Sequence, residues 1–169
     1  STASADRGLQ PSQPLGEPIV SSDALIVARR ANAWDEGGYR YLLLEEDAAL
    51  TAGSYGFVGR RAVVRIRNEQ RPGVVVHHLA IYFDNARPRG SDAPVNAQGS
   101  RLLVTLSTTG NVRLATDLLQ ETSAAGDALV NEAMGRFARY DAAINVPVLN
   151  VPAGDVLYGP EVEARRQAR

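Results

Sequence analysis

The chain has 169 residues, 44% of them hydrophobic, and a formal net charge of −1, which suits one globular domain with a single core. It contains no cysteine, so disulfides, thiolate metal sites and a cysteine nucleophile are excluded. All 18 basic residues are arginine and are scattered along the chain, which excludes a phosphate-loop or Schiff-base lysine and gives no indication of a nucleic-acid-binding surface.

Residues 1–22 are rich in Ser, Pro, Gln and Gly, a composition that predicts a flexible linker. No apolar stretch reaches the roughly 18 residues that a transmembrane helix requires, so no transmembrane segment is expected. The chain opens on Ser1 rather than Met, and we expect a trimmed sequence. A removed signal peptide or membrane anchor would suit a periplasmic or otherwise exported protein, but cytosolic linkers have the same composition.

A β pattern begins near residue 23. Residues 24–28 and 39–44 are short apolar runs, and the turn-forming residues 32–38 between them predict a hairpin. A strand phrase then occurs twice, at residues 41–53 and 102–116. In each copy an apolar strand runs into a polar or glycine break, Glu-Asp at 46–47 or Gly-Asn at 110–111, and then resumes. This recurrence predicts stacked β units rather than a catalytic α/β fold.

The middle of the chain continues this pattern. Residues 61–67 alternate between an apolar face and a face that is largely arginine. The apolar face consists of Ala62, Val64 and Ile66. Residues 74–83 are mostly apolar on both faces, which predicts a strand covered on both sides. Residues 84–99 are dense in Pro, Gly and Asn and predict a long polar loop.

Helical spacing appears after residue 126. Apolar residues recur every three or four positions over residues 127–140, which predicts one amphipathic helix. The predicted organisation is a flexible linker at 1–22, a β domain at 23–118, a helical segment at 119–145 that packs on or caps the sheet, and an extended Pro-containing tail at 146–169.

The reactive side chains do not predict an enzyme, a cofactor or a metal. His77 and His78 are adjacent on a predicted strand and point to opposite faces, so they cannot share a metal ion. The spacing of the sequence assigns no orienting carboxylate and no nucleophile to either histidine, so we expect both to be structural residues of the sheet. Ser54 is interpreted as a turn residue, and the acidic residues 45–47 as a solvated strand break rather than a calcium site. The enzyme alternative is favoured only if His77 or His78 lies in a cleft with a carboxylate and has a perturbed pKa.

Four stretches carry a family resemblance. They are Leu-Leu-Leu-Glu-Glu-Asp-Ala-Ala-Leu at 42–50, Ser-Tyr-Gly-Phe-Val-Gly-Arg-Arg-Ala-Val-Val at 54–64, Ala-Ile-Tyr-Phe-Asp at 80–84 and Thr-Gly-Asn-Val-Arg-Leu at 109–114. With them, residues 24–116 resemble the organic-solvent-tolerance-type domain of lipopolysaccharide transport proteins. The chain departs from that pattern at Gly59 and Arg60, where the family prefers Ala-Asp, and in its C-terminal helix.

The resemblance implies a mainly β fold, an open β-jellyroll of stacked antiparallel strands, here with one C-terminal amphipathic helix. It also implies a non-enzymatic periplasmic protein of the cell envelope that binds or passes an amphipathic lipid such as lipopolysaccharide during outer-membrane biogenesis. Such domains stack edge to edge with copies of themselves or with related β-jellyroll proteins. The alternative is a structural or interaction module of a larger envelope protein, with a filled core and no ligand.

Inward apolar rows on the predicted strands would line the lipid groove. They comprise Val64, Ile66, Leu79, Ile81, Phe83, Leu102, Val104 and Leu106. Arginines of the neighbouring strand would meet an anionic headgroup near the mouth of the groove, and these are Arg61, Arg65 and Arg67. For each apolar residue the alternative is ordinary core packing.

Overall fold

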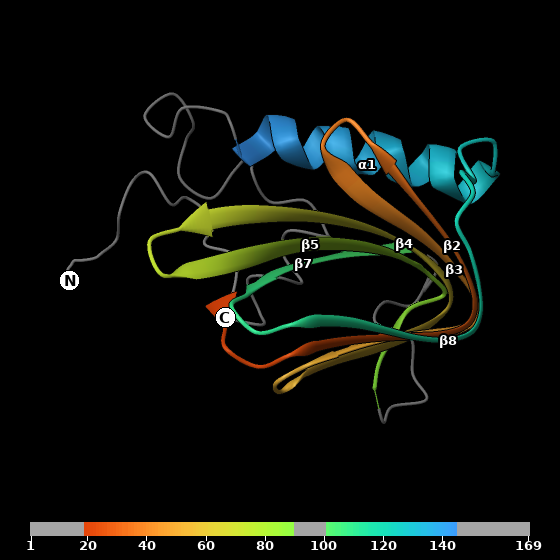
Figure 1. Cartoon of the computed structure of the whole chain (residues 1–169). Coiled ribbons are helices and arrows are strands. Elements are labelled where there is room, and N and C mark those ends of the chain that lie inside the picture. The colour runs from red at the N-terminus through yellow and green to blue at the C-terminus, as the bar shows by residue number, and fades with distance from the viewer. Residues whose placement is uncertain (1–18, 90–100, 145–169) are drawn as a thin grey trace.

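The computed structural model describes residues 19–89 and 101–144. This part of the chain forms one open sheet followed by one helix, so the predicted fold, a mainly β open β-jellyroll with a C-terminal helix, is confirmed (Figure 1). The elements are β1 (Ile19–Val20), β2 (Ala24–Glu36), β3 (Tyr39–Ala52), β4 (Tyr55–Arg71), β5 (Val74–Asp84), β6 (Arg87–Pro88), β7 (Arg101–Thr108), β8 (Val112–Gln120) and α1 (Ala128–Ile144). Most of the predicted linker, the predicted tail and much of the predicted polar loop lie outside the described residues.

The sheet curves so strongly that it forms two layers joined by a bend (Figure 1). The strands β2, β3 and β4 are 13, 14 and 17 residues long and run through the bend. The register between β3 and β4 shifts between Glu45 and Ala48. There Glu46 and Asp47 have positive φ angles of 66° and 65°. Since a β-bulge bends its strand, the predicted acidic break is a bulge within one long strand rather than a gap between two strands.

The strand order is β1-β7-β5-β4-β3-β2-β8, with β6 paired to β4. The internal pairs are antiparallel, whereas the pairs at the two edges, β1 with β7 and β2 with β8, are parallel. Both parallel pairs keep the same sequence offset, because Ile19 pairs with Ser107 and Ala24 pairs with Val112. The segment that contains β1 and β2 therefore runs beside the segment that contains β7 and β8 in both layers. The sequence did not predict this parallel pairing.

The two parallel segments pass from one layer to the other at the same corner. The backbone N–H of Thr109 donates a hydrogen bond to the carbonyl oxygen of Val20 at 2.9 Å there. A β-carbon on Gly110 would lie 2.7 Å from the backbone oxygen of Ser22. Glycine is therefore required by the close approach of two backbones, and the predicted break at this glycine is confirmed as the junction of β7 and β8.

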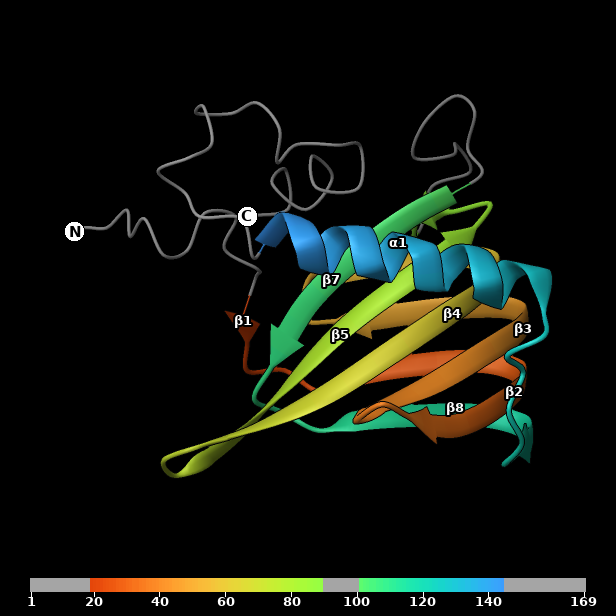
Figure 2. The same ribbon diagram turned by 90° about the horizontal axis from the view of Figure 1, so that it is seen from above.

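Each face of the sheet carries its own apolar cluster. Leu42 and Leu44 point into the inner cluster, which the two layers enclose, whereas Leu43 points into the outer cluster, which α1 covers. Figure 2 shows α1 lying across β4, β5 and β7. Bulky aromatic residues, including Trp34 and Tyr82, lie in the outer cluster. The sheet is therefore buried on both faces where the helix crosses it.

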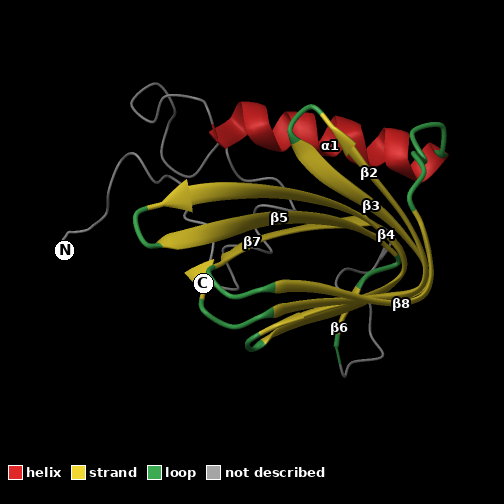
Figure 3. Cartoon of the chain, in the orientation of Figure 1, coloured by secondary structure: helices red, strands yellow, loops and turns green. Residues whose placement is uncertain are grey.

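The predicted amphipathic helix is confirmed as α1 (Figure 3). Its buried face consists of Leu129, Val130, Ala133, Phe137 and Tyr140. The helix begins after Asp127, whose Oδ1 accepts a hydrogen bond from the backbone N–H of Leu129 at 2.8 Å. This contact satisfies one of the free N–H groups of the first turn.

Two other predictions concern single strands. The alternation at residues 61–67 is confirmed, because Ala62 and Val64 are fully buried in the inner cluster and Ile66 packs against it. The predicted extent of the first hairpin turn, residues 32–38, is wrong. The strand β2 continues to Glu36, and the turn consists of Gly37 and Gly38, which have positive φ angles. Backbone pairing with β3 overrides the turn propensity of the preceding polar residues.

Candidate functional site

The eight apolar residues predicted to line a groove lie on β4, β5 and β7 and belong to, or pack against, the inner cluster. The strand register arranges them in three rows across the sheet. The rows are Ile66, Leu79 and Leu106; Val64, Ile81 and Val104; and Phe83 and Leu102. All but Ile66 are at most 8% exposed. Along most of their length, the rows are therefore filled by their own side chains.

A cavity of about 680 Å³ opens at the Ile66 end of these rows. Ile66 and Val112, which both pack against the inner cluster, form its apolar wall. The remaining lining residues are mostly polar, and they are Asp35, Gly38, Tyr39, Arg40, Asn68, His77 and Asn111. We call this cavity the mouth. Its volume lies within the range of roughly 300–1,000 Å³ that is typical of small-molecule pockets.

Polar side chains are fixed around the mouth. Arg40 donates hydrogen bonds to both carboxylate oxygens of Glu121 at 3.0 Å and to Asp35 at 3.3 Å. The hydrogen bond to Glu121 raises the pKa of Arg40 above its ordinary value and outweighs desolvation, which lowers it. On the opposite side, Nδ1 of His77 lies 2.6 Å from Oδ1 of Asn68. An apolar wall with a polar rim suits an amphipathic molecule.

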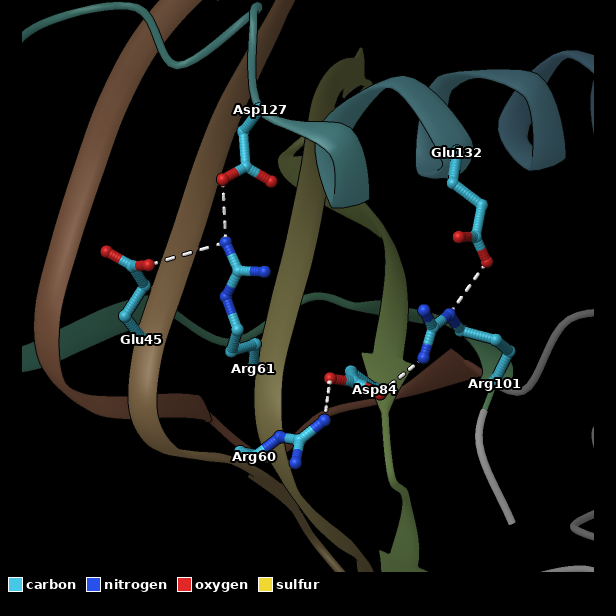
Figure 4. A network of polar contacts seen from close by, with 7 residues as sticks. All are labelled: Glu45, Arg60, Arg61, Asp84, Arg101, Asp127 and Glu132. Atoms are coloured by element: carbon cyan, nitrogen blue, oxygen red, sulfur yellow. Dashed lines mark hydrogen bonds and ion pairs between the residues drawn. The ribbon is translucent and has the colours of Figure 1, made fainter. Parts of the chain in front are cut away.

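The three arginines predicted to meet a headgroup are Arg61, Arg65 and Arg67. They alternate along β4 with the inward residues and so lie on the face that α1 covers. Arg61 forms an ion pair with Asp127 at 2.7 Å (Figure 4), and Arg65 forms one with Asp141 at 2.8 Å. Arg67 lines a cavity of about 250 Å³ beside the last turns of α1. The structure therefore does not bring these arginines together with the inner rows or the mouth.

A charged network at the end of β5 was missed by the sequence reasoning. Asp84 is 6% exposed and accepts hydrogen bonds from Arg60, at 2.9 Å, and from Arg101 (Figure 4). Arg101 also contacts Glu132 of α1 at 2.7 Å. Burial raises the pKa of Tyr82, and the hydrogen bond that it donates to Glu132 raises it further. The sequence feature that could have indicated this network is Asp84 itself, an acidic residue at the end of the mostly apolar run 74–83.

His78 lies between a carboxylate and a hydroxyl group. Its Nε2 lies 2.8 Å from Oε1 of Glu69, and its Nδ1 lies 2.7 Å from Oγ of Ser107. Hydrogen bonds from Arg71 and then His78 lower the pKa of Glu69 to about 2, so this carboxylate stays ionised. Ser107 is only 1% exposed, which keeps its hydroxyl away from any substrate. The geometry thus resembles that of a hydrolytic triad without an accessible nucleophile.

The described residues also bear on metal binding and on membrane crossing. Within residues 19–89 and 101–144, no three His, Asp or Glu side chains are grouped so that they could hold a metal ion. Among the helices that the structure describes, none is both long and apolar enough to cross a membrane. No protein-family model, curated protein or solved structure matches the chain.

Proposed function

We propose that this chain is a non-enzymatic module of the cell envelope that binds or passes an amphipathic lipid, such as lipopolysaccharide, through its open β-jellyroll. The observation that carries the proposal is the continuity of the apolar rows with the mouth. Ile66 belongs to both, so an acyl chain seated against the mouth would face the side chains of the first row. The resemblance to the organic-solvent-tolerance-type family, with its periplasmic location, supports the same function.

In this proposal the acyl chain enters between the layers and the headgroup stays outside. The partly buried Ile66 and Val112 offer the first apolar contacts. The headgroup meets the polar rim, where His77 and Asn111 line the cavity and can bond a phosphate or a sugar hydroxyl, whereas Arg40 is already held by Glu121 and Asp35. Because the rows are already filled, deeper entry requires the two layers to separate.

The edges of the sheet support a second part of the proposal, association with another β-jellyroll. In the described part of the chain, β8 is the last strand and pairs on one side with β2. Its free edge presents backbone groups that another strand can bind. Leu118 and Leu119 near its end are 49% and 44% exposed. Copies of this chain, or related domains, would extend the lipid path by edge-to-edge pairing.

One observation favours the alternative function, a structural or interaction module without a ligand. Seven of the eight residues in the rows are at most 8% exposed, so the interior is a well-packed core as it stands. A module of this kind would use the free edge of β8 for protein partners and would keep its interior closed.

The experiment combines native mass spectrometry with site-specific photocrosslinking. The protein is incubated with lipopolysaccharide or a control phospholipid, with a benzophenone side chain placed at Ile66 in one variant and at Ala138 in another. Ala138 is exposed on α1 and does not line the mouth, so it reports chance contacts. A stoichiometric adduct of lipopolysaccharide with crosslinking at Ile66 alone supports the proposal. An unmodified mass under all conditions, or equal crosslinking at both positions, overturns it and favours the interaction module.

A further inference from the structure

A second cavity, of about 620 Å³, lies on the outward face of the layer that contains β8. Leu25 and Val27 alternate along β2 with Ala24 and Ile26, which belong to the inner cluster, so they point away from the interior. We call this cavity the trough. Its lining residues are Leu25, Val27, Asp47, Ala48, Ala49, Val58, Gly59, Arg60, Asn85, Arg87 and Arg89.

The strand register builds the floor of the trough from short apolar side chains. Val27 of β2 pairs with Ala49 of β3. Ala49 pairs with Val58 of β4, which in turn pairs with Arg87 of β6. At about 4.8 Å per strand, this row across four strands spans about 14 Å. It is an apolar strip that ends in a guanidinium group.

Positive charge gathers at the β6 end of this strip. Arg89 donates a hydrogen bond to Oγ1 of Thr51 at 2.8 Å, and Arg60 is held by Asp84 at 2.9 Å. Arg87 has neither a hydrogen-bond nor an ion-pair partner among the described residues. Its five donors are therefore available to a ligand, and an unpaired arginine beside an apolar surface favours a bidentate acceptor such as a carboxylate.

We infer that the trough binds a single acyl chain with a carboxylate head, a fatty-acid-type ligand. The chain lies across β2, β3 and β4 along the row of Val27, Ala49 and Val58, and the carboxylate pairs with Arg87. Asp47 also lines the trough. Its carboxylate repels an anionic head, whereas the guanidinium of Arg87 attracts it. This site is separate from the mouth, because the two lie on opposite faces of the sheet.

The test titrates the methyl-labelled protein with dodecanoate and follows the Leu, Val and Ile methyl signals by NMR. Saturable shifts at Leu25, Val27 and Val58 are expected, with dodecyl maltoside and dodecyltrimethylammonium binding at least tenfold more weakly. Shifts confined to Ile66, Val112 and the inner cluster would overturn the inference. In that case dodecanoate binds through the mouth, a result that leaves the proposed function intact.

Two variants test the chemistry of the head and of the floor. Arg87→Gln should weaken dodecanoate binding about tenfold, because a charge-assisted hydrogen bond is replaced by a neutral one. Ala49→Leu adds bulk at a partly buried position that faces the trough and should abolish binding without disturbing the fold. The matched control is Arg71→Gln, which removes an arginine outside the trough and should leave the affinity unchanged. Equal affinity of all four proteins, or equal binding of the cationic or neutral detergent, overturns the inference.

Discussion

Arg65 on β4 and Asp141 on α1 form a two-pronged ion pair, with both terminal nitrogens of the guanidinium 2.8 Å from the two carboxylate oxygens. The guanidinium also lies 4.5 Å from the ring centre of Tyr39 and 5.0 Å from that of Phe137. Desolvation lowers the pKa of Arg65, but the hydrogen bonds to Asp141 outweigh it, so the pKa is raised. This pair fixes the C-terminal part of the helix over the outer aromatic cluster.

The first prediction is that Arg65→Ala destabilises the protein by about 2–3 kcal/mol. The side chain is 11% exposed, and breaking a buried pair leaves the partner charge uncompensated, although Asp141 is 36% exposed and is partly relieved by water. Urea unfolding measures the change in the free energy of unfolding. The control is Arg71→Ala, which breaks the exposed pair with Glu69 and should cost less than about 1 kcal/mol.

A double-mutant cycle separates this ion pair from the ring contacts. Asp141→Asn removes the charge but leaves Arg65 over Tyr39 and Phe137, so its cost should be smaller than that of Arg65→Ala. The double variant should cost clearly less than the sum of the two single variants, because the two residues share one interaction. Strict additivity, or equal losses for Arg65→Ala and Arg71→Ala, would mean that the pair does not hold the helix.

The second prediction concerns acid stability and Asp127. Burial raises the pKa of this residue, but hydrogen bonds from Arg61 and from the N–H of Leu129 outweigh it and lower the pKa. A carboxyl with a lowered pKa in the folded state stabilises the protein above its unfolded pKa, near 3.9, and loses that contribution as the pH falls further. Asp127→Asn should therefore cost about 1 kcal/mol at pH 7, and this difference from the wild type should shrink below about pH 4.

The capping role of Asp127 gives a matched variant. Asparagine caps helices about as well as aspartate, so Asp127→Asn mainly removes the charge that pairs with Arg61. Asp127→Ala also removes the cap and should cost about 1 kcal/mol more, with little dependence of that extra loss on pH. Denaturation series at pH 3, 5 and 7 compare the three proteins. A constant difference between wild type and the Asn variant across this range would refute the linkage.

The sequence was a good guide wherever structure depends on local periodicity. The alternation of Val64 and Ile66 with arginines identified the inner face of β4, and the spacing of Leu129, Ala133 and Phe137 identified the helix. Both signals arise because a strand repeats every two residues and a helix every 3.6 residues, whatever they pack against. The eight predicted groove residues share one face for the same reason.

Features that depend on distant partners were not predictable in this way. Nothing near Ala24 indicates that it pairs in parallel with Val112, because that pairing depends on how the whole sheet curves. The burial of Asp84 likewise requires Arg60 and Arg101 to meet around it from two other strands. The arginines of β4 were expected near the mouth of the groove because the local pattern does not show that α1 covers their face, where Asp127 and Asp141 become ion-pair partners.

The third prediction concerns the corner where the two parallel segments cross between the layers. A methyl group on Gly110 would lie 2.7 Å from the backbone oxygen of Ser22, and neither backbone can move without breaking the hydrogen bond from Ala24 N–H to the carbonyl oxygen of Asn111. Gly110→Ala should therefore cost about 2–3 kcal/mol, in the upper part of the range for overpacking. Amide hydrogen exchange at Ala24 should also accelerate, because that bond closes the corner. The control is Gly126→Ala, where no atom lies within 4 Å of the added methyl and the change should stay within about 0.5 kcal/mol. If the Gly110 variant unfolded at the wild-type urea concentration and kept slow exchange at Ala24, the two segments would have to be farther apart in solution than they are here.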